Sequence, residues 1–152
     1  MIVVVSACLA GMPVRYDGQH KGHELIQQWL SEKKAIPVCP ELLGGLQTPR
    51  EPAEIVGGTG DDVLEGCAQV IDRKGNDVSD QFIAGAYKTL SKIQELDASL
   101  VILKEDSPSC GSRSIYSGSF NGEKIQGNGV TAALLKKHGI EVCSEHELVN
   151  MG

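Results

Sequence analysis

Features typical of membrane and secreted proteins are missing from this chain. No apolar run reaches the roughly 18 residues that a membrane-spanning helix needs. The apolar N-terminal stretch, residues 1–5, is short and has no basic residues before it, so it fits a buried strand better than a signal peptide. We therefore expect a cytoplasmic protein that makes no membrane contact.

The sequence also lacks an excess of basic residues. It holds 14 Lys and Arg against 20 Asp and Glu, which gives a formal net charge of -6. Surfaces that bind long nucleic acids are usually basic, so we expect no extended nucleic-acid surface, although a single base or nucleotide is compatible with this charge. A phosphate-binding loop motif is absent too, which favours a small uncharged ligand.

Closely spaced cysteines are a third absence. The five cysteines match no zinc-finger spacing and include no Cys-x-x-Cys pair. In a reducing compartment they should not form a disulfide framework. A metal site would have to be assembled by the fold from distant segments. A metal-independent thiol enzyme is disfavoured, because it would need a Cys-x-x-Cys motif or a histidine positioned at a cysteine.

The composition is that of an ordinary globular protein. Of 152 residues, 41% are hydrophobic and 22% are charged, and this length suffices for one hydrophobic core, so we expect a single domain over residues 1–152. Glycine is enriched, at 18 residues, with clusters at 44–45, 57–60 and 127–129. Such clusters allow positive-φ turns or a close approach of backbone to a ligand. For residues 57–60 we favour ordinary turn chemistry.

Hydrophobic patterns predict strands that alternate with helices. Strands are expected at residues 2–6, 35–38, 100–103 and 140–142, with a short strand near 68–71. Helices are expected at 24–34, 80–96 and 129–137, and a short terminal helix begins at 144. Loops are expected at 41–54, and an irregular or hairpin segment at 112–127. The alternation predicts a single-domain, three-layer α/β sandwich with a mostly parallel, Rossmann-like sheet.

Three cysteines, Cys8, Cys39 and Cys110, each lie a few residues beyond the end of a predicted strand. Ligands bind beyond the carboxyl ends of the strands in such sheets, so we expect these three to converge on one site. Proline, glycine and small residues surround each of them, and such loops can present backbone N–H groups to a thiolate. Cys67 and Cys143 are expected to be ordinary buried cysteines outside the site.

Three thiolates can hold a metal in more than one way. A structural zinc ion would need a fourth protein ligand, for which His20 and His23 are the candidates. A four-iron cluster normally takes four cysteines, so with three of them one iron keeps an open position. An open iron is a Lewis acid with affinity for soft sulfur ligands. The residues alone leave an iron–sulfur enzyme and a non-catalytic or regulatory zinc-binding domain as competing hypotheses.

Long motifs around the three cysteines resemble those of a known family. They read Ser-Ala-Cys-Leu-x-Gly-x-x-x-Arg-Tyr-Asp-Gly at 6–18, Cys-Pro-Glu-x-x-Gly-Gly-Leu-x-x-Pro-Arg-x-Pro-Ala-Glu at 39–54, and Lys-x-x-Ser-Pro-Ser-Cys-Gly at 104–111. With Gly-x-Gly-Val-Thr at 127–131, they closely resemble the thiouracil desulfurase family over essentially the whole chain.

This resemblance implies a [4Fe-4S] cluster bound by Cys8, Cys39 and Cys110. The family reaction removes sulfur from a thiolated nucleobase such as 2-thiouracil: the open iron takes the sulfur and water supplies the new oxygen. The expected partner is therefore a small thiolated base. The resemblance also implies catalytic roles for Glu41, as the acid and base, and for Ser107, with Ser109 as the competing choice.

Further polar residues match the same motifs. Arg50 and Glu54 flank two prolines, and we expect them to pair and to pin their loop. Lys104 or Arg15 is a candidate to offset thiolate charge or to contact a base carbonyl. Tyr16 and Asp17 complete the set without an assigned role.

Overall fold

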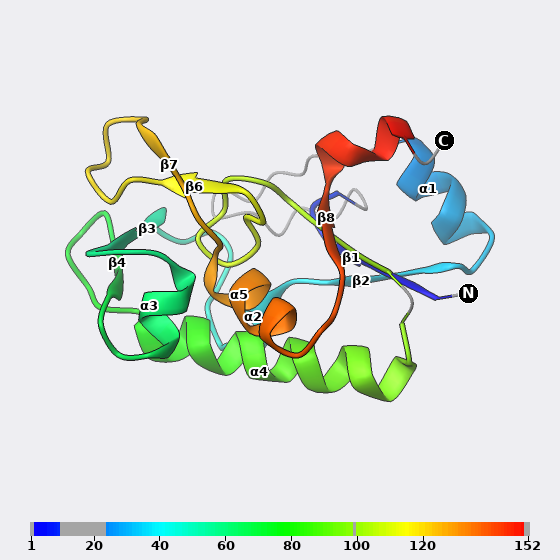
Figure 1. Cartoon of the computed structure of the whole chain (residues 1–152), viewed down its shortest axis with the longest axis horizontal. Helices are drawn as coiled ribbons and strands as arrows, with labels where there is room; N and C mark the ends of the chain where they lie inside the picture. Colours follow the sequence, from blue (N-terminus) through cyan, green and yellow to red (C-terminus); the bar gives the residue numbers. More distant parts are fainter. Residues whose placement is uncertain (1, 10–23, 99, 151–152) are drawn as a thin grey trace.

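The computed structural model describes residues 2–9, 24–98 and 100–150 (Figure 1). The strands are β1 (Val3–Ser6), β2 (Ala35–Val38), β3 (Ala53–Val56), β4 (Gln69–Asp72), β5 (Leu100–Leu103), β6 (Ser114–Tyr116), β7 (Lys124–Gln126) and β8 (Val142–Ser144). The helices are α1 (Glu24–Ser31), α2 (Pro40–Leu43), α3 (Gly60–Leu64), α4 (Ser79–Leu96), α5 (Val130–Lys137) and the 3-10 helix η1 (Glu145–Asn150). No helix in the described part of the chain combines the length and apolar character of a membrane span.

Four strands form a parallel sheet in the order β2-β1-β5-β8. Strand β1 lies inside this sheet, and its residues Val3, Val4 and Val5 have no solvent exposure. A continuous β-branched run of this kind is typical of a parallel strand that is covered on both faces. The predicted mostly parallel sheet is confirmed.

Helices cover both faces of this sheet (Figure 1). On one face, Val4 and Leu103 belong to a large apolar cluster that includes residues of α4 and α5. On the other face, Val3 and Ile102 pack in a smaller cluster with Ile26 of α1. Alternate residues of a strand point to opposite faces, so one strand supplies both clusters. The three-layer α/β arrangement is therefore confirmed.

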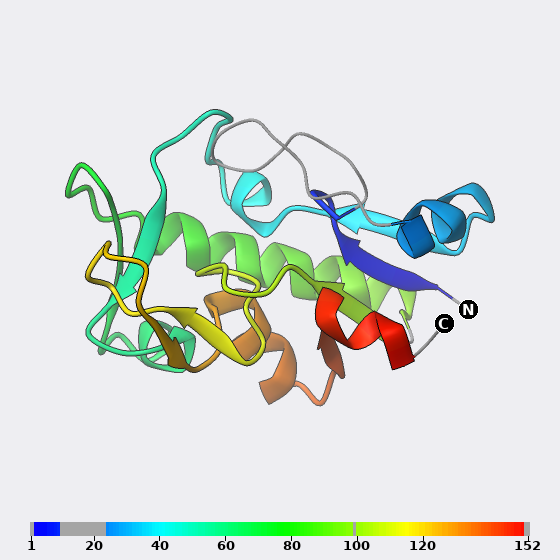
Figure 2. The ribbon, with the colours of Figure 1, turned by 90° about the horizontal axis from the view of Figure 1, so that it is seen from above.

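Two small antiparallel units lie at one end of the molecule (Figures 1 and 2). Strands β3 and β4 form one unit, and the β6–β7 hairpin forms the other. A carboxylate joins them: Glu54 Oε1 accepts the backbone N–H groups of Gly118 at 2.9 Å and Phe120 at 3.2 Å. The predicted hairpin is present, and these two hydrogen bonds hold it beside β3.

The predicted loop at 41–54 is the main error in the expected elements. It contains most of α2 and the start of β3, and α3 was not expected either. Pro40 begins α2, where its missing N–H is harmless and its fixed φ suits a helix. Strand β3 exists because it pairs with β4, a non-local interaction that a short sequence window does not contain.

Smaller differences have local causes. Helix α1 ends at Ser31 instead of residue 34, because Lys33 adopts a left-handed φ of 59° and turns the chain toward β2. The last strand begins at Val142 instead of residue 140, because the Ile140 N–H closes α5 by donating to the Leu135 carbonyl at 3.1 Å. The short terminal helix is a 3-10 helix.

Helix α2 packs against α4 through two glycines. A Cβ on Gly44 would collide with the backbone carbonyl of Gln81, and a Cβ on Gly85 would collide with that of Pro40. The two backbones are therefore in direct contact, which no larger side chain would permit. This contact at the Pro40 carbonyl holds the backbone of the neighbouring residues, Cys39 and Glu41, against α4.

We predict that Gly85→Ala destabilises the protein by about 1–3 kcal/mol, because the added methyl group overpacks this crossing. Urea denaturation measures the loss. Ser91→Ala, on the exposed face of the same helix, is the control and should change stability by less than about 0.5 kcal/mol. An unchanged urea midpoint for Gly85→Ala would contradict the close crossing.

Candidate active site

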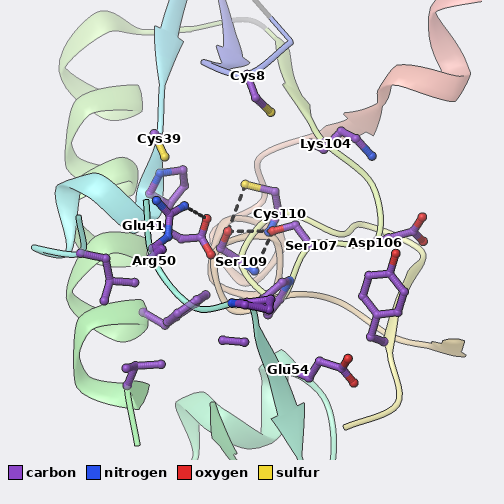
Figure 3. Close-up of a pocket in the computed structure, with 18 of the residues that line it drawn as sticks. Cys8, Cys39, Glu41, Arg50, Glu54, Lys104, Asp106, Ser107, Ser109 and Cys110 are labelled. Carbon is purple, nitrogen blue, oxygen red and sulfur yellow. Dashed lines mark hydrogen bonds and ion pairs between the residues drawn. The ribbon is translucent and has the colours of Figure 1, made fainter. Parts of the chain in front are cut away.

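A cavity of about 470 Å³ lies where the carboxyl ends of β1, β2 and β5 meet (Figure 3). Its volume falls within the range of about 300–1,000 Å³ that is usual for small-molecule sites. Cys8, Cys39 and Cys110 all line it, and Figure 3 shows their sulfur atoms around one shared space. The structure thus brings the three cysteines of the sequence motifs to one edge of the sheet.

Each of these cysteines is placed by the strand that precedes it. Cys8 follows β1, where the Ala7 N–H donates to the Val38 carbonyl at 2.7 Å and ties this end of β1 to β2. Cys39 is the residue immediately before α2 and is partly buried. Cys8 and Cys110 are buried, at 8% and 5% exposure. Two of the three thiols are therefore buried close to the ends of the sheet strands.

Burial disfavours the charged form of these thiols. It raises the pKa of Cys110, and a hydrogen bond from Ser109 Oγ to Cys110 Sγ, 3.4 Å long, opposes this effect only in part. Burial also raises the pKa of Cys39, against the opposing effect of the Leu42 backbone N–H. A bound cation reverses this balance, because it favours the deprotonated thiolate.

Two serines shape the turn before Cys110. Ser107 Oγ accepts the N–H groups of Ser109 and Cys110, each at 3.1 Å. The Oγ atoms of Ser107 and Ser109 lie 3.0 Å apart. Ser109 is 1% exposed, whereas Ser107 is only partly buried, and both line the cavity. Ser107 is the more accessible hydroxyl, and Ser109 is directed at the thiol.

A buried carboxylate that the sequence analysis did not single out organises the same loop. Glu105 is 5% exposed, and its Oε1 accepts the N–H groups of Ser112, Arg113 and Ser114 at 2.9, 3.1 and 3.2 Å. Burial opposes ionisation of Glu105, but these backbone donors outweigh it and lower the pKa of the carboxyl group. The Glu105 carboxylate therefore holds the backbone that follows Cys110.

Glu41 lies on the cavity wall beside Cys39 and forms an ion pair with Arg50 (Figure 3). The Arg50 Nη2 atom is 2.6 Å from Glu41 Oε2, and both side chains are mostly buried. Arg50 Nη1 also donates to the Gln47 carbonyl and to Thr48 Oγ1, each at 3.0 Å. The guanidinium group thus holds the Glu41 carboxylate in one orientation.

The expected pair of Arg50 and Glu54 is wrong. Arg50 pairs with Glu41, and Glu54 instead accepts the N–H groups of the hairpin, because its side chain points to the opposite end of the cavity (Figure 3). Lys104 also lines the cavity, but its Nζ atom lies 2.9 Å from Glu145 Oε2. That carboxylate lies on η1.

Comparison with known proteins decides the family. The sequence model of the 2-thiouracil desulfurase family matches residues 3–147. The chain belongs to the 2-thiouracil desulfurase family. It is 56% identical over 147 residues to the uncharacterized protein YbbK of Bacillus subtilis (strain 168), with 97% of each chain covered. It is also similar to the solved structure of the [4Fe-4S]-dependent thiouracil desulfidase TudS, at 43% identity and a TM-score of 0.86, covering 98% of this chain and 93% of TudS. The family predicted from the motifs is confirmed.

The two remaining cysteines of this desulfurase-family chain do not line the cavity. Cys143 is 4% exposed and packs in the core, as expected. The expectation that Cys67 is buried is wrong: it is exposed, because it follows the end of α3 in a turn at the surface. Predictions on Arg15, Tyr16, Asp17, His20 and His23 fall outside the described residues.

The three cysteines do not form a site for a single ion. Among the described residues, no three His, Cys, Asp or Glu side chains are arranged to hold one metal ion. Structural zinc requires its ligands to converge on one ion. The zinc hypothesis names His20 or His23 as the fourth ligand, and both lie outside the described residues.

We predict that Glu105→Ala destabilises this family member by about 2–4 kcal/mol, because it leaves one buried and two partly buried N–H groups without their acceptor. Glu105→Gln should cost less, because an amide oxygen can still accept. The lowered pKa means that the carboxylate stabilises the fold above its ordinary pKa of 4.5 and loses this effect as pH falls through the folded-state value.

Urea denaturation at several pH values checks both parts. The stability difference between wild type and Glu105→Gln should shrink as the pH falls below 4.5. Glu65→Gln makes the same charge change at an exposed position and is the control. A pH-independent difference would show that the charge of Glu105 is not what holds the loop.

Proposed function

We propose that this chain is an iron–sulfur enzyme that removes sulfur from a thiolated nucleobase of the 2-thiouracil type. The thione and one water molecule would be consumed, and the oxo base and hydrogen sulfide would be formed. The observation that carries this proposal is the convergence of Cys8, Cys39 and Cys110 on one cavity, with Glu41 and Ser107 on its wall. Family membership and the similarity to TudS support it.

The cavity suits a [4Fe-4S] cluster with three protein ligands. Thiolates are the usual ligands of such clusters, and the described cavity wall contributes three of them from three different loops. Cys8, Cys39 and Cys110 would each bind one iron, which leaves the fourth iron without a protein ligand. When bound, the cluster supplies a Lewis acid with affinity for the exocyclic sulfur of the substrate.

We assign proton transfer to Glu41. Replacing sulfur by oxygen requires that water lose a proton as it attacks the ring carbon and that the departing sulfur be protonated. Glu41 lies two residues from Cys39, and Arg50 holds its carboxylate at 2.6 Å. This ion pair keeps the carboxylate oriented without a rearrangement during the reaction. Arg50 therefore acts as a positioning residue for Glu41.

Between the two serines, we assign substrate contact to Ser107. Its oxygen accepts two backbone N–H groups, and its proton points to Ser109 Oγ, 3.0 Å away, from which it would turn toward a bound base. It is also the less buried of the pair. Ser109 donates toward Cys110 Sγ and is almost fully buried, which suits a role in stabilising the thiolate. Ser107 would donate a hydrogen bond to a ring nitrogen or carbonyl of the base.

We also infer that the enzyme works in the cytoplasm. The five cysteines form no disulfide with one another, and three of them would serve as ligands. A reducing compartment keeps such thiols available for iron.

We predict that the protein, reconstituted anaerobically with iron and sulfide, is brown and holds about four irons per chain, the content of one cluster. Addition of 2-thiouracil should release sulfide in proportion to the uracil formed. Cys39→Ser should lose the cluster and the activity, whereas Cys67→Ser, an exposed cysteine off the cavity, should keep both. A wild-type protein that binds no iron, or that is fully active without it, would disprove the proposal.

We predict that Glu41→Gln lowers kcat by about 10²–10⁴-fold while iron content stays unchanged, because the carboxamide cannot exchange protons. Steady-state kinetics and iron analysis on the same preparation separate the two effects. Glu65→Gln is the matched control at an exposed position. If Glu41→Gln loses its iron, the residue supports the cluster and the assigned proton transfer is wrong.

A further inference from the structure

Two glycine clusters that have no part in the proposed chemistry meet behind the loop that carries Cys110. One cluster ends at Gly60, the first residue of α3, and the other ends at Gly129, the residue before α5. The Gly60 N–H donates to the Asn128 carbonyl at 2.7 Å, so the two clusters are in backbone contact. Ordinary turn chemistry, expected for residues 57–60, does not explain this contact.

The start of α5 binds the Cys110 loop through its backbone. The first N–H groups of a helix have no partner within the helix. Here they donate to loop carbonyls: Gly129 to Gly111 and Val130 to Pro108, each at 2.8 Å, and Thr131 and Ala132 to Ser109, at 2.8 and 3.1 Å. The accepting carbonyls belong to Pro108, Ser109 and Gly111, which lie on either side of Cys110 in the loop. The helix therefore holds the loop on the side away from the cavity.

The peptide group between Ser109 and Cys110 is fixed at both ends. Its carbonyl accepts two N–H groups from α5, and its N–H donates to Ser107 Oγ at 3.1 Å. The peptide group after Cys110 is held too, because its N–H, that of Gly111, donates to the Ser107 carbonyl at 2.9 Å. With both flanking peptide planes held, φ and ψ of Cys110 and the direction of its Cα–Cβ bond are fixed. The direction in which the Cys110 side chain leaves the backbone therefore depends on contacts with Ser107 and with α5.

There is no room for a side chain at the contact. A Cβ on Gly129 would lie 2.6 Å from the Ser109 carbonyl carbon and 2.7 Å from the Pro108 carbonyl oxygen. A Cβ on Gly60 would collide with the carbonyl of Gly129 from the other side. These neighbours are backbone atoms, which cannot rotate aside as a side chain can. Any larger residue must push α5 and the loop apart.

We propose that Gly129, supported from behind by Gly60, is a positioning residue that sets the Cys110 sulfur in place for metal binding. The assignment of Cys110 as a ligand rests on the proposed function, but the contact between α5 and the loop does not. A ligand held in advance by rigid neighbours binds metal with less loss of freedom and releases it more slowly.

The first test uses the protein without iron. Iodoacetamide labelling, mapped by mass spectrometry, compares Cys110 with Cys143, a second buried cysteine away from the cavity. In Gly129→Ala, Cys110 should be labelled about tenfold faster than in wild type while Cys143 is unchanged, because only the loop opens. Unchanged labelling of Cys110, or equal acceleration of both cysteines, would overturn the proposal.

Gly139→Ala, beyond the other end of the same helix, is the matched control. Gly139 lies just beyond the other end of α5, has a positive φ of 75°, and would place its Cβ in open space. The substitution strains the backbone there but leaves the loop contact intact. In Gly139→Ala, the labelling rate of Cys110 should stay within about twofold of the wild-type rate. Acceleration of Cys110 equal to that in Gly129→Ala would assign the effect to general loosening of α5 and overturn the proposal.

The second test uses the iron-loaded protein. Gly129→Ala should release iron to a chelator about tenfold faster than wild type and than Gly139→Ala, and the electron paramagnetic resonance spectrum of its reduced cluster should differ from theirs. An identical spectrum and release rate would contradict the proposed positioning. If wild type binds no iron, the proposed function fails, and the labelling experiment still decides the contact.

If the Gly129→Ala variant does not fold, two further measurements test the same contact. Gly60→Ala displaces Gly129 without touching the loop itself and should accelerate labelling of Cys110 over that of Cys143. In wild type, the Gly129 and Thr131 amides both donate to carbonyls of the loop, so they should share one hydrogen-exchange protection factor, because one opening releases both. Protection factors that differ by more than about tenfold would overturn the contact, as would unchanged labelling in Gly60→Ala.

Discussion

The site depends on the parallel pairing of β1 with both β2 and β5. Ser6 is the partner of Val38, and Val5 is the partner of Ile102, so the three strands end almost level. Because parallel strands point the same way, the residues that follow them emerge at one edge. A one-residue slip of β1 would turn its core residues to the opposite face, so the packing that stabilises the sheet also keeps this edge in register.

Hydrogen bonds to polar side chains then hold the loops that follow the strands in fixed conformations. Ser6 Oγ accepts the Lys104 N–H at 2.9 Å, which ties the end of β1 to the residue after β5. Glu105 gathers the N–H groups that follow Cys110, and Glu145 Oε1 accepts the Glu105 N–H at 2.7 Å. Each carboxylate is stabilised by the backbone donors that it satisfies, so the loop and its buried charge stabilise one another. The cysteines can therefore occupy irregular backbone and still hold fixed positions.

The sequence predicted the sheet and the convergence of the cysteines because both follow from local patterns. Strand 35–38 has the predicted bounds, and an unbroken apolar β-branched run identifies β1 as a buried strand. The ion-pair and hydrogen-bond partners of individual charged residues could not be predicted from local patterns. Arg50 lies near Glu54 in sequence yet pairs with Glu41, across the turn in which the Leu46 N–H donates to the Glu41 carbonyl. Glu105 was missed because its partners only become neighbours once the loop has closed.

Burial raises the pKa of both Cys110 and Cys39, and hydroxyl donors oppose it at Cys110, whereas the Leu42 N–H and the Arg50 guanidinium oppose it at Cys39. The ammonium group of Lys104 pairs with Glu145, and the guanidinium group of Arg50 pairs with Glu41. Ser109 and Ser6 instead donate to Cys110, and both lower the pKa of its thiol against the larger effect of burial. Hydroxyl donors favour a thiolate without adding charge. Beside Cys110, the described residues can therefore favour an anionic thiolate without placing a cation there that would attract other anions.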